Sequence, residues 1–325
     1  MKRTLRGALK LLVAAPLVLA AFAANAEYPD RPVRIVIPYP PGGISDKLLR
    51  PIAQKMGEDL KVPFVIDNKP GANGLIGTEQ VAKSAPDGYT LVMGSTSTLP
   101  MNAALNPKMP FDPIKDLAPV TSFAIAPQVL TVNPNVPAKT VQELIALAKS
   151  RPGEITYATP GIGSSPHFAG EMFSTMTGVK MLHVPYKGGA PASMDLIAGQ
   201  VMVGFDSIGS AAPYIRANKL RALGLAAPKR SPAMPDLPTI SEAGVPGFEV
   251  GTLFALFAPA NTPRDVINKL YNEMVRVLAS PEIRDSMVSV GTEPIAMTPE
   301  QLGDNIKSDM VKWAKVAREA NIHAE

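Results

Sequence analysis

Short apolar strands alternate with amphipathic helices along most of the chain, and this alternation restricts the fold more than any other feature. Residues 33–37 form an apolar run typical of a buried strand, and residues 46–60 carry leucine, isoleucine and methionine on one helical face. Further strand and helix pairs are predicted at 64–66 and 75–83, 155–158 and 168–176, 181–184 and 190–198, and 201–205 followed by the segment after Ser207. This pattern predicts an α/β protein whose mostly parallel sheets are flanked by helices.

The first 26 residues have the three parts of a secretory signal peptide. Four basic residues precede the apolar stretch 11–22, and Ala24-Asn25-Ala26 has the small-residue pattern of a cleavage site. The alternative, an uncleaved membrane anchor, is disfavoured because this stretch is shorter than the roughly 20 apolar residues that span a bilayer. We expect cleavage after Ala26 and export to the periplasm, since the sequence shows no second apolar stretch of spanning length.

Charge and cysteine content argue against several classes of protein. The sequence has 32 basic and 28 acidic residues, and the leader holds four of the basic ones, so 28 of each remain and the formal net charge is zero. A nucleic-acid partner is therefore not expected, since such domains carry a basic patch of their own. The lack of cysteine excludes disulfides, thiol nucleophiles and cysteine zinc sites, and the length suggests two domains.

Several strand-to-helix turns are rich in glycine and hydroxyl side chains. Ligands of an open parallel sheet collect beyond the carboxyl ends of the strands, where helices present unpaired N–H groups and the positive ends of their dipoles. The predicted ligand-binding residues are Tyr39, Pro41, Gly42, Gly43, Ile44, Ser45 and Asp46 in the first turn, Ser95 and Thr96 in the next, then Thr159, Gly161, Ser164, Ser165 and His167, and finally Tyr186, Lys187, Gly188 and Ala190. One such turn is more often a plain connection, but their repetition predicts an anion site.

Motifs for other chemistry are missing. No G-x-x-x-x-G-K-[ST] phosphate loop occurs, and Gly161-x-Gly163 lacks the third glycine of a dinucleotide fingerprint, so a carboxylate is the favoured anion. No cofactor or metal is expected. The serine-hydrolase and zinc-protease signatures are absent as well. A nucleophile at Ser164 or Ser165 activated by His167 stays open, because catalytic triads are spatial arrangements.

Two acidic residues and two histidines have alternative interpretations. Asp46 lies in the first turn of its helix, where it either contacts a ligand or only interacts with the helix dipole. Asp206, followed by Ser207, ends a strand at the expected cleft, where a carboxylate can accept from a ligand hydroxyl, an amine or a water. His167 either touches a ligand or bonds the backbone, whereas His183 in an apolar strand fits a core position.

Motifs in the same order along the chain resemble a known family. The segments "PYPPGGISD", "VIDNKPGANGLIGTEQVAKSAPDGYTL", "YATPGIGSSPHFAGEMF", "HVPYKGGAPASMDLIAGQV" and "LPTISEAGVPGF" are similar to those of the periplasmic solute receptors of tripartite tricarboxylate transporters, the Bug or TctC-like proteins. The resemblance implies a two-lobed type II periplasmic binding protein, with residues 27–125 and 226–325 in lobe 1 and residues 126–225 in lobe 2. It also implies that the turns above, with Asp206 and Ser207, hold a carboxylate between the lobes.

The resemblance further implies a function and partners. A monomeric receptor that is not an enzyme would close on a small organic acid and deliver it to a membrane permease of the tripartite tricarboxylate type. A periplasmic sensor module that signals to a membrane histidine kinase is the alternative, since its fold and pocket would be identical. The chain departs from the family at Thr252, Leu253 and Phe254, where many members carry a tryptophan, and at Ile44, where a smaller residue or proline is common. Two anion-binding lobes favour a dicarboxylate, and an apolar Ile44 suits a bulkier or aromatic acid, so aromatic dicarboxylates are included.

Overall fold

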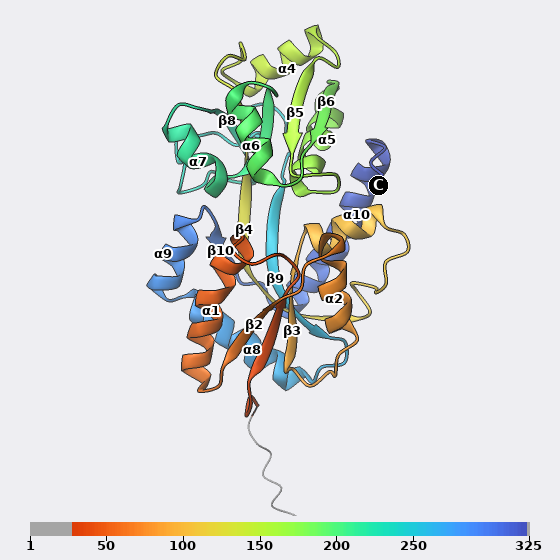
Figure 1. The fold of residues 1–325 in the computed structure, drawn as a ribbon, viewed down its shortest axis with the longest axis vertical. Coiled ribbons are helices and arrows are strands. Elements are labelled where there is room, and N and C mark those ends of the chain that lie inside the picture. The colour runs from red at the N-terminus through yellow and green to blue at the C-terminus, as the bar shows by residue number, and fades with distance from the viewer. Residues whose placement is uncertain (1–27, 324–325) are drawn as a thin grey trace, which may run out of the picture.

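The protein consists of two halves joined by strands that run through both (Figure 1). The structure is a computed structural model, and it describes residues 28–323. The predicted signal peptide and its cleavage site, residues 1–26, lie outside the described residues. Within residues 28–323, no helix combines the length and the apolar character needed to cross a membrane.

The first half, in the lower part of Figure 1, is built on three parallel strands in the order β2-β1-β3. These strands are β1 (Val33–Ile37), β2 (Phe64–Asn68) and β3 (Thr90–Ser95). The helices of this half are α1 (Ile44–Leu60), α2 (Leu75–Ala82), α3 (Asn102–Leu105), α8 (Arg264–Leu278) and α9 (Pro281–Ser289), with short helical turns at Ala72–Gly74 and Ser97–Met101. The predicted strand at residues 33–37 is found with these bounds, and the first helix begins two residues before the predicted one.

The second half repeats this design with different segments. Its parallel strands lie in the order β7-β5-β6 and are β5 (Ile155–Thr159), β6 (Met181–Pro185) and β7 (Val203–Ser207). The helices are α4 (Val141–Ser150), α5 (Ser165–Thr177), α6 (Gly189–Ala198) and α7 (Ile208–Arg216), and β8 (Arg221–Ala226) leads out of this half. The strand predicted at residues 201–205 lies two residues further along the chain, so Asp206 and Ser207 belong to the strand itself.

Antiparallel strands connect the halves. Strand β4 (Leu117–Val132) pairs with β9 (Gly251–Pro259) in the first half and then with β7 and β8 in the second. The two-residue strand β10 (Glu293–Pro294) also pairs with β4. The last helix, α10 (Pro299–Glu319), begins beside the first half and reaches α5 of the second (Figure 1). The junction therefore consists of β4, β9 and α10, whereas the segment 227–250 packs on the second half through Ile240 and Phe248.

Each half has its own apolar core. In the first half, Ile35 and Leu49 pack with Leu270 between the sheet and helices α1 and α8, and in the second half Tyr157 packs with Phe173. Burying one such side chain stabilises the fold by roughly 1.5–3 kcal/mol. These cores confirm the predicted α/β class with two lobes, and the lobe boundaries at 125 and 225 stay a prediction.

Candidate ligand-binding site

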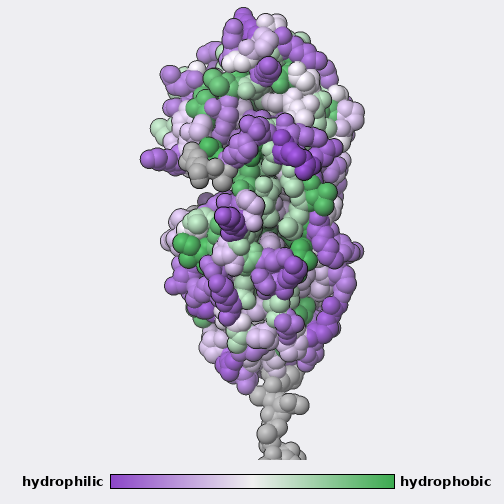
Figure 2. All heavy atoms as spheres, turned by 90° about the vertical axis from the view of Figure 1, so that its right-hand side faces the viewer, coloured by the Kyte–Doolittle hydropathy of each residue, from purple (hydrophilic) through white to green (hydrophobic). Residues whose placement is uncertain are grey.

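The strand register places the carboxyl ends of both sets of parallel strands beside the same short stretch of β4. Strand β3 ends at Ser95, which lies opposite Phe254 of β9, and Phe254 lies opposite Ala124 of β4. Strand β7 approaches from the other half and ends at Ser207, opposite Gln128 of β4. The stretch of β4 from Ala124 to Gln128 measures about 13 Å. The loops that follow the two sets of strands therefore face each other, and Figure 2 shows the surface hollowed between the halves.

The loop between β1 and α1 presents a helix terminus without a side-chain cap. Gly43 is the N-cap residue of α1, and within residues 28–323 this end of the helix has no side-chain cap. Gly42 has a φ of 86°, in the left-handed region that glycine adopts at little cost. Pro41, Gly42 and Gly43 are exposed, whereas Ile44 packs partly against the first core. These N–H groups and the positive end of the helix dipole are thus accessible to an anion.

Asp46 stabilises the loop between β1 and α1 by accepting hydrogen bonds from Arg50 and Asn68. Its side chain is almost fully buried, and its carboxylate accepts from Arg50 Nε at 2.7 Å and from Asn68 Nδ2 at 3.2 Å. Asn68 Nδ2 also donates to the Tyr39 carbonyl oxygen at 3.1 Å. Neighbouring Ser45 is buried too. Because groups of the first half engage both oxygens of Asp46, the structure places this residue as a support of the loop.

Ser95 and Thr96, at the carboxyl end of β3, lie next to the loop between β1 and α1. The Ser95 hydroxyl lies 3.2 Å from the Tyr39 hydroxyl, and burial raises the pKa of Tyr39. Thr96 Oγ1 accepts from the backbone N–H of Leu253 at 3.0 Å, which joins β3 to β9. Ser95 and Thr96 are both nearly fully buried. Their hydroxyl groups thus have partners inside the first half.

The loop between β5 and α5 is held by a chain of hydrogen bonds. The Thr159 hydroxyl lies 2.7 Å from His183 Nε2, and it also accepts from the Gly161 N–H at 3.2 Å. Ser164 Oγ donates to the Gly161 carbonyl at 2.6 Å and, as the N-cap of α5, accepts from the N–H of His167. This network determines the path of the backbone between Thr159 and the start of α5.

The two histidines stack beneath that loop and are neutral at pH 7. Their rings are 3.9 Å apart at the centroids, and His167 Nδ1 accepts from the Gly163 N–H at 3.2 Å. Burial lowers the pKa of His167 to about 3, with His183 adding to the shift, and burial lowers the pKa of His183 to about 4. Of the two alternatives for His167, the structure shows the backbone bond. His183, which we expected in the core, is only half-buried.

Gln128 is a candidate that sequence analysis missed. Its Nε2 donates to Ser165 Oγ at 2.6 Å, and its Oε1 is buried without a hydrogen-bond partner among the described residues. The signal available in the sequence was one amide side chain within the apolar run 123–130. Ser165 thus contacts Gln128, Ser164 contacts the Gly161 carbonyl, and within residues 28–323 neither hydroxyl bonds the His167 ring. The arrangement lacks the nucleophile–base contact of a triad.

The loop between β6 and α6 presents a second uncapped helix terminus. Gly188 is the N-cap of α6 with a φ of 111°, and no side chain of the described part of the chain caps this end. The N–H of Tyr186 donates to the Thr159 carbonyl at 2.9 Å, so the two loops of the second half are connected. Burial and Asp195 raise the pKa of the Tyr186 hydroxyl to about 12, and this hydroxyl donates to Asp195 at 2.7 Å. Lys187 is exposed and has no ion pair in the described part of the chain; Ala190 is exposed too.

Asp206 has only one partner for its carboxylate within the described residues. Its Oδ2 accepts from Ser193 Oγ at 3.2 Å, and no cation pairs with it there. Burial raises the pKa of Asp206 to about 6, against the opposing effect of the Ser193 hydrogen bond. Ser207 is used differently, since it caps α7 by accepting from the N–H of Ser210. Asp206 therefore keeps hydrogen-bond acceptor capacity for a further group.

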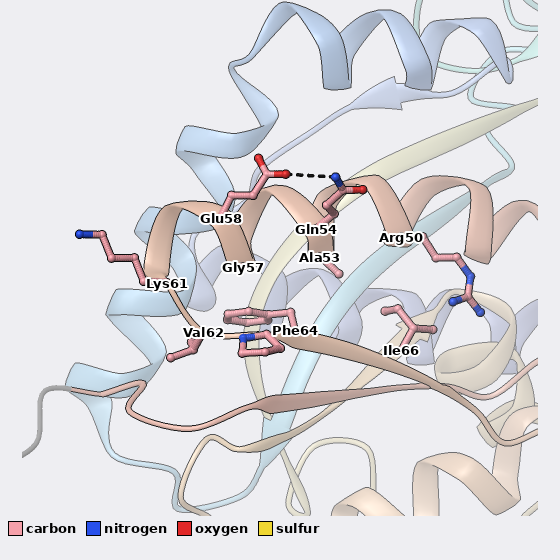
Figure 3. A pocket seen from close by; sticks show the side chains of 10 residues that line it. Arg50, Ala53, Gln54, Gly57, Glu58, Lys61, Val62, Phe64 and Ile66 are labelled. Atoms are coloured by element: carbon pink, nitrogen blue, oxygen red, sulfur yellow. Dashed lines mark hydrogen bonds between the residues drawn. The ribbon is translucent and has the colours of Figure 1, made fainter.

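Another cavity, of about 600 Å³, lies between α1 and β2 on the first half (Figure 3). Arg50, Gln54 and Phe64 are among the residues around it, and none of the predicted ligand-binding residues lines it. Among residues 28–323 no group of three or more histidine, aspartate or glutamate side chains could hold a metal ion. The predicted site is thus the set of facing loops, separate from this cavity.

Facing loops at the junction of two α/β halves define a two-lobed solute-binding protein of the type II periplasmic class, with its ligand cleft between the lobes. Residues 48–322 match the family described as "Tripartite tricarboxylate transporter family receptor". The chain belongs to this family of solute-binding receptors, which are periplasmic.

Relatives agree with this assignment over nearly the whole chain. Protein BugT of Bordetella pertussis is 36% identical over 302 residues, which cover 93% of each chain. A solved structure of an R. palustris protein with adipate has a TM-score of 0.79 at 36% identity and covers 91% of this chain and 99% of that one. MatC from Rhodopseudomonas palustris with bound malate has a TM-score of 0.75 at 33% identity and covers 89% and 99% of the two chains.

Proposed function

We propose that this protein is an extracytoplasmic receptor that captures a small organic dicarboxylate by hinge closure and delivers it to a membrane permease of the tripartite tricarboxylate type. The observation that carries the proposal is the pair of uncapped helix termini, α1 at Gly43 and α6 at Gly188, which come from opposite halves. Each terminus offers N–H groups and a positive dipole end to one carboxylate. A ligand with two carboxylates would therefore hold the two halves together.

The predicted residues take distinct roles in this proposal. The backbone of Gly42, Gly43 and Ile44 holds one carboxylate. The N–H groups of Gly189 and Ala190 hold the other, since the Gly188 N–H already donates to the Pro160 carbonyl at 3.0 Å. Pro41, Ser45, Gly161 and the hydroxyls of Ser164 and Ser165 complete the walls, with Tyr39, Ser95, Thr96, Thr159, His167 and Tyr186 as supports. Removing a carboxylate from water costs free energy, and preorganised N–H donors in a shielded cleft offset that cost.

Asp206 and Ile44 would select the middle of the ligand in this proposal. A carboxylate with one hydroxyl partner has room to accept from a ligand hydroxyl or an ordered water. It would repel a third carboxylate, so a tricarboxylate is disfavoured relative to a dicarboxylate. The half-buried Ile44 adds an apolar surface at the mouth, which leaves aromatic dicarboxylates within the class.

Relatives with known ligands support the choice of class. The neighbouring structures were solved with adipate and with malate, and both molecules carry two carboxylates. The predicted signal peptide fits a receptor that works in the periplasm after cleavage behind Ala26. The proposal includes a monomeric receptor without catalytic activity, since closure on a ligand requires one cleft and no bond chemistry.

A thermal-shift screen of the mature chain tests the ligand class. The panel contains aliphatic and aromatic mono-, di- and tricarboxylates, applied after unfolding and refolding to strip bound ligand. A dicarboxylate at 100 times its dissociation constant adds about 2.7 kcal/mol to the folded state and raises the melting temperature. Response to monocarboxylates alone, or to none of the panel, would contradict the proposal.

A glycine substitution in the first loop tests the site. A Cβ at Gly43 would have its nearest neighbour, the Pro40 carbonyl oxygen, at 3.9 Å, and its backbone lies in an ordinary extended region, so Gly43→Ala should fold normally. The added methyl group would occupy the space of the ligand carboxylate and should weaken binding at least tenfold in calorimetry. Gly303→Ala on α10 is the matched control, since a Cβ there meets Pro119 at an ordinary 3.5 Å. Equal affinity in both variants would place the ligand elsewhere.

Transport of the identified dicarboxylate tests the permease partnership. Cells of the source organism that lack this receptor should take up the labelled acid more slowly, and the intact gene should restore uptake while the Gly43→Ala variant does not. Unchanged uptake together with a lost transcriptional response to the acid would favour a sensor that signals to a histidine kinase.

A further inference from the structure

The two halves touch on both flanks of the cleft, and the two contacts differ in kind. On the right of Figure 1, α10 and the helical turn Ser97–Met101 pack into the core of the second half. Met101 and Trp313 are almost fully buried there, and the Trp313 ring meets Phe168 of α5 edge-on with 5.5 Å between the ring centroids. Separating this flank would expose apolar side chains to water, so it should stay closed.

On the other flank, the halves touch through backbone atoms of two glycines. Helix α7 of the second half lies above α9 of the first half on the left of Figure 1. A Cβ at Gly209 of α7 would lie 1.9 Å from the carbonyl oxygen of Val290, and a Cβ at Gly291 would lie 2.2 Å from the Gly209 nitrogen. We call this the glycine contact. Within residues 28–323 no hydrogen bond or ion pair joins these two turns, so the glycine contact can open without breaking one.

The two glycines have different local reasons to be glycine. Gly291 follows the end of α9 with a φ of 73°, and its N–H donates to the Val288 carbonyl at 2.9 Å. Gly209 lies in the first turn of α7 (Ile208–Arg216), where its backbone is helical. Glycine is disfavoured relative to alanine within a helix. The close approach of Val290 and Gly291 is therefore the structural reason for a glycine at position 209.

The glycine contact lies beside the strand that crosses between the halves. Strand β7 ends opposite Gln128 of β4, and β10 begins opposite Ile125 of the same strand. The two touching turns therefore leave β4 within the stretch 125–128. Because α6 and α7 belong to the same half, a wider gap at Gly209 would also move the α6 terminus away from the α1 terminus.

We infer that the glycine contact sets the limit of lobe closure and thereby the length of the dicarboxylate that the cleft selects. The inference rests on the proposed function, in which one acid bridges the α1 and α6 termini. A methyl group at position 209 would stop closure earlier by about 1 Å or more, because nonbonded heavy atoms do not approach as closely as 1.9 Å. Gly209 is thus a positioning residue, which acts on the ligand through the distance between the two termini.

Affinity across a series of acids tests this role. Mature wild-type protein and Gly209→Ala are titrated by calorimetry with straight-chain dicarboxylates from succinate to suberate. We expect the acid that the wild type binds best to bind Gly209→Ala at least tenfold more weakly, and the preferred acid to become longer by at least one methylene group. Gly303→Ala is the matched control, since it also places alanine in a helix, and its Cβ meets Pro119 at an ordinary 3.5 Å. The control should keep the wild-type preference.

Thermal unfolding without ligand separates closure from folding. If the glycine contact forms only on closure, the open form accommodates the methyl group, and alanine favours the helix more than glycine does. The melting temperature of ligand-free Gly209→Ala should then equal or exceed that of the wild type. A value lower by more than about 3 °C would show that the contact is part of the permanent fold and would overturn the inference.

Distances between spin labels report the closure limit directly. The chain has no cysteine, so Arg216→Cys on α7 and Arg284→Cys on α9 introduce two unique labelling sites, both exposed and on the flank that should open. Double electron–electron resonance is recorded with and without the best-bound acid. We expect the shortest distance reached with the acid to be longer in the Gly209→Ala background than in the wild-type and Gly303→Ala backgrounds. Equal distances in all three backgrounds would contradict a closure limit at the glycine contact.

The outcomes distinguish this inference from the function on which it rests. Binding of a dicarboxylate by the wild type with an unchanged length preference in Gly209→Ala would overturn the inference alone. A wild type that binds no dicarboxylate would overturn the proposed function and the inference together. A weaker affinity for every acid by the same factor, without a change in preferred length, would also count against a closure limit.

Discussion

The two halves each place an aspartate near the cleft, and they treat it in opposite ways. Asp46 in the first half accepts from Arg50 and Asn68 and is 3% exposed. Asp206 in the second half has the Ser193 hydroxyl as its one hydrogen-bond partner among the described residues, and burial raises its pKa to about 6. The difference separates two roles: a carboxylate with a full set of donors supports the loop, and a carboxylate with one donor remains available to a ligand.

The strongest test of this comparison is Asp46→Asn. The neutral amide cannot accept from Arg50 and Asn68 as the carboxylate does, so charge-assisted hydrogen bonds are lost. We expect the free energy of unfolding at pH 7 to fall by about 3 kcal/mol, measured by urea denaturation of the mature chain. Asp265→Asn, in the first turn of α8 but away from the cleft, is the control. A change below about 0.5 kcal/mol would remove Asp46 from its supporting role.

Asp206→Asn should act in the opposite direction. The folded-state pKa of about 6 lies above the ordinary value of 3.8, so the folded protein binds the proton more tightly than the unfolded chain. Stability contributed by this group is therefore lost as the pH rises from about 4 to about 6. The amide removes that loss and should raise the free energy of unfolding at pH 7 by about 3 kcal/mol, with little effect at pH 4. Denaturation at both pH values checks the sign, and a variant less stable at pH 7 would refute it.

Ser193→Ala sharpens the description of Asp206. Without the hydroxyl, the carboxylate loses the donor that holds its pKa down, so we expect that pKa to rise further above 6. The free energy of unfolding at pH 7 should fall by about 1 kcal/mol. An NMR titration of the Asp206 side chain follows the pKa, with Ser174→Ala in α5 as the control. A lower pKa in Ser193→Ala would show that another group stabilises the charge.

Lys187→Met should have the smallest effect on stability. The side chain is exposed and forms no ion pair within residues 28–323, so we expect the melting temperature to change little, equivalent to less than about 0.5 kcal/mol. Differential scanning calorimetry measures this change. A larger loss would reveal that Lys187 supports the α6 terminus in the same way that Asp46 supports α1.

Parts of the fold that depend on local pattern could be predicted from the sequence. The strand at 33–37 and the α1 helix follow from apolar runs and helical spacing within a short window. The sequence pattern does not predict strand β4, because Pro119 and Pro127 argue against a strand interior. In the structure, the pairing of β4 with β9 shifts register after Pro119, and Pro127 lies opposite the first residue of β9, so both prolines fall where the ladder is irregular or ends.

The same distinction between local pattern and long-range contact applies to the candidate site. Glycine-rich turns predict helix termini near a ligand, and the uncapped ends at Gly43 and Gly188 agree with that expectation. The bond from Thr159 to His183 and the contact of Gln128 with Ser165 join residues 24 and 37 positions apart, and no periodic pattern encodes such pairs. Supports of a loop are therefore harder to predict than the loop itself, because they depend on which strands become neighbours.

The position of β9 in the sheet has a consequence for the order of folding. This strand, Gly251–Pro259, lies between β3 and β4, which precede it by more than a hundred residues in the chain. The sheet of the first half therefore stays incomplete until the chain beyond residue 259 is available, whereas strands β5, β6 and β7 follow one another without such a delay. Long-range pairing of this kind is slow. The first half should therefore complete its sheet later than the second half, once the chain beyond residue 259 is available.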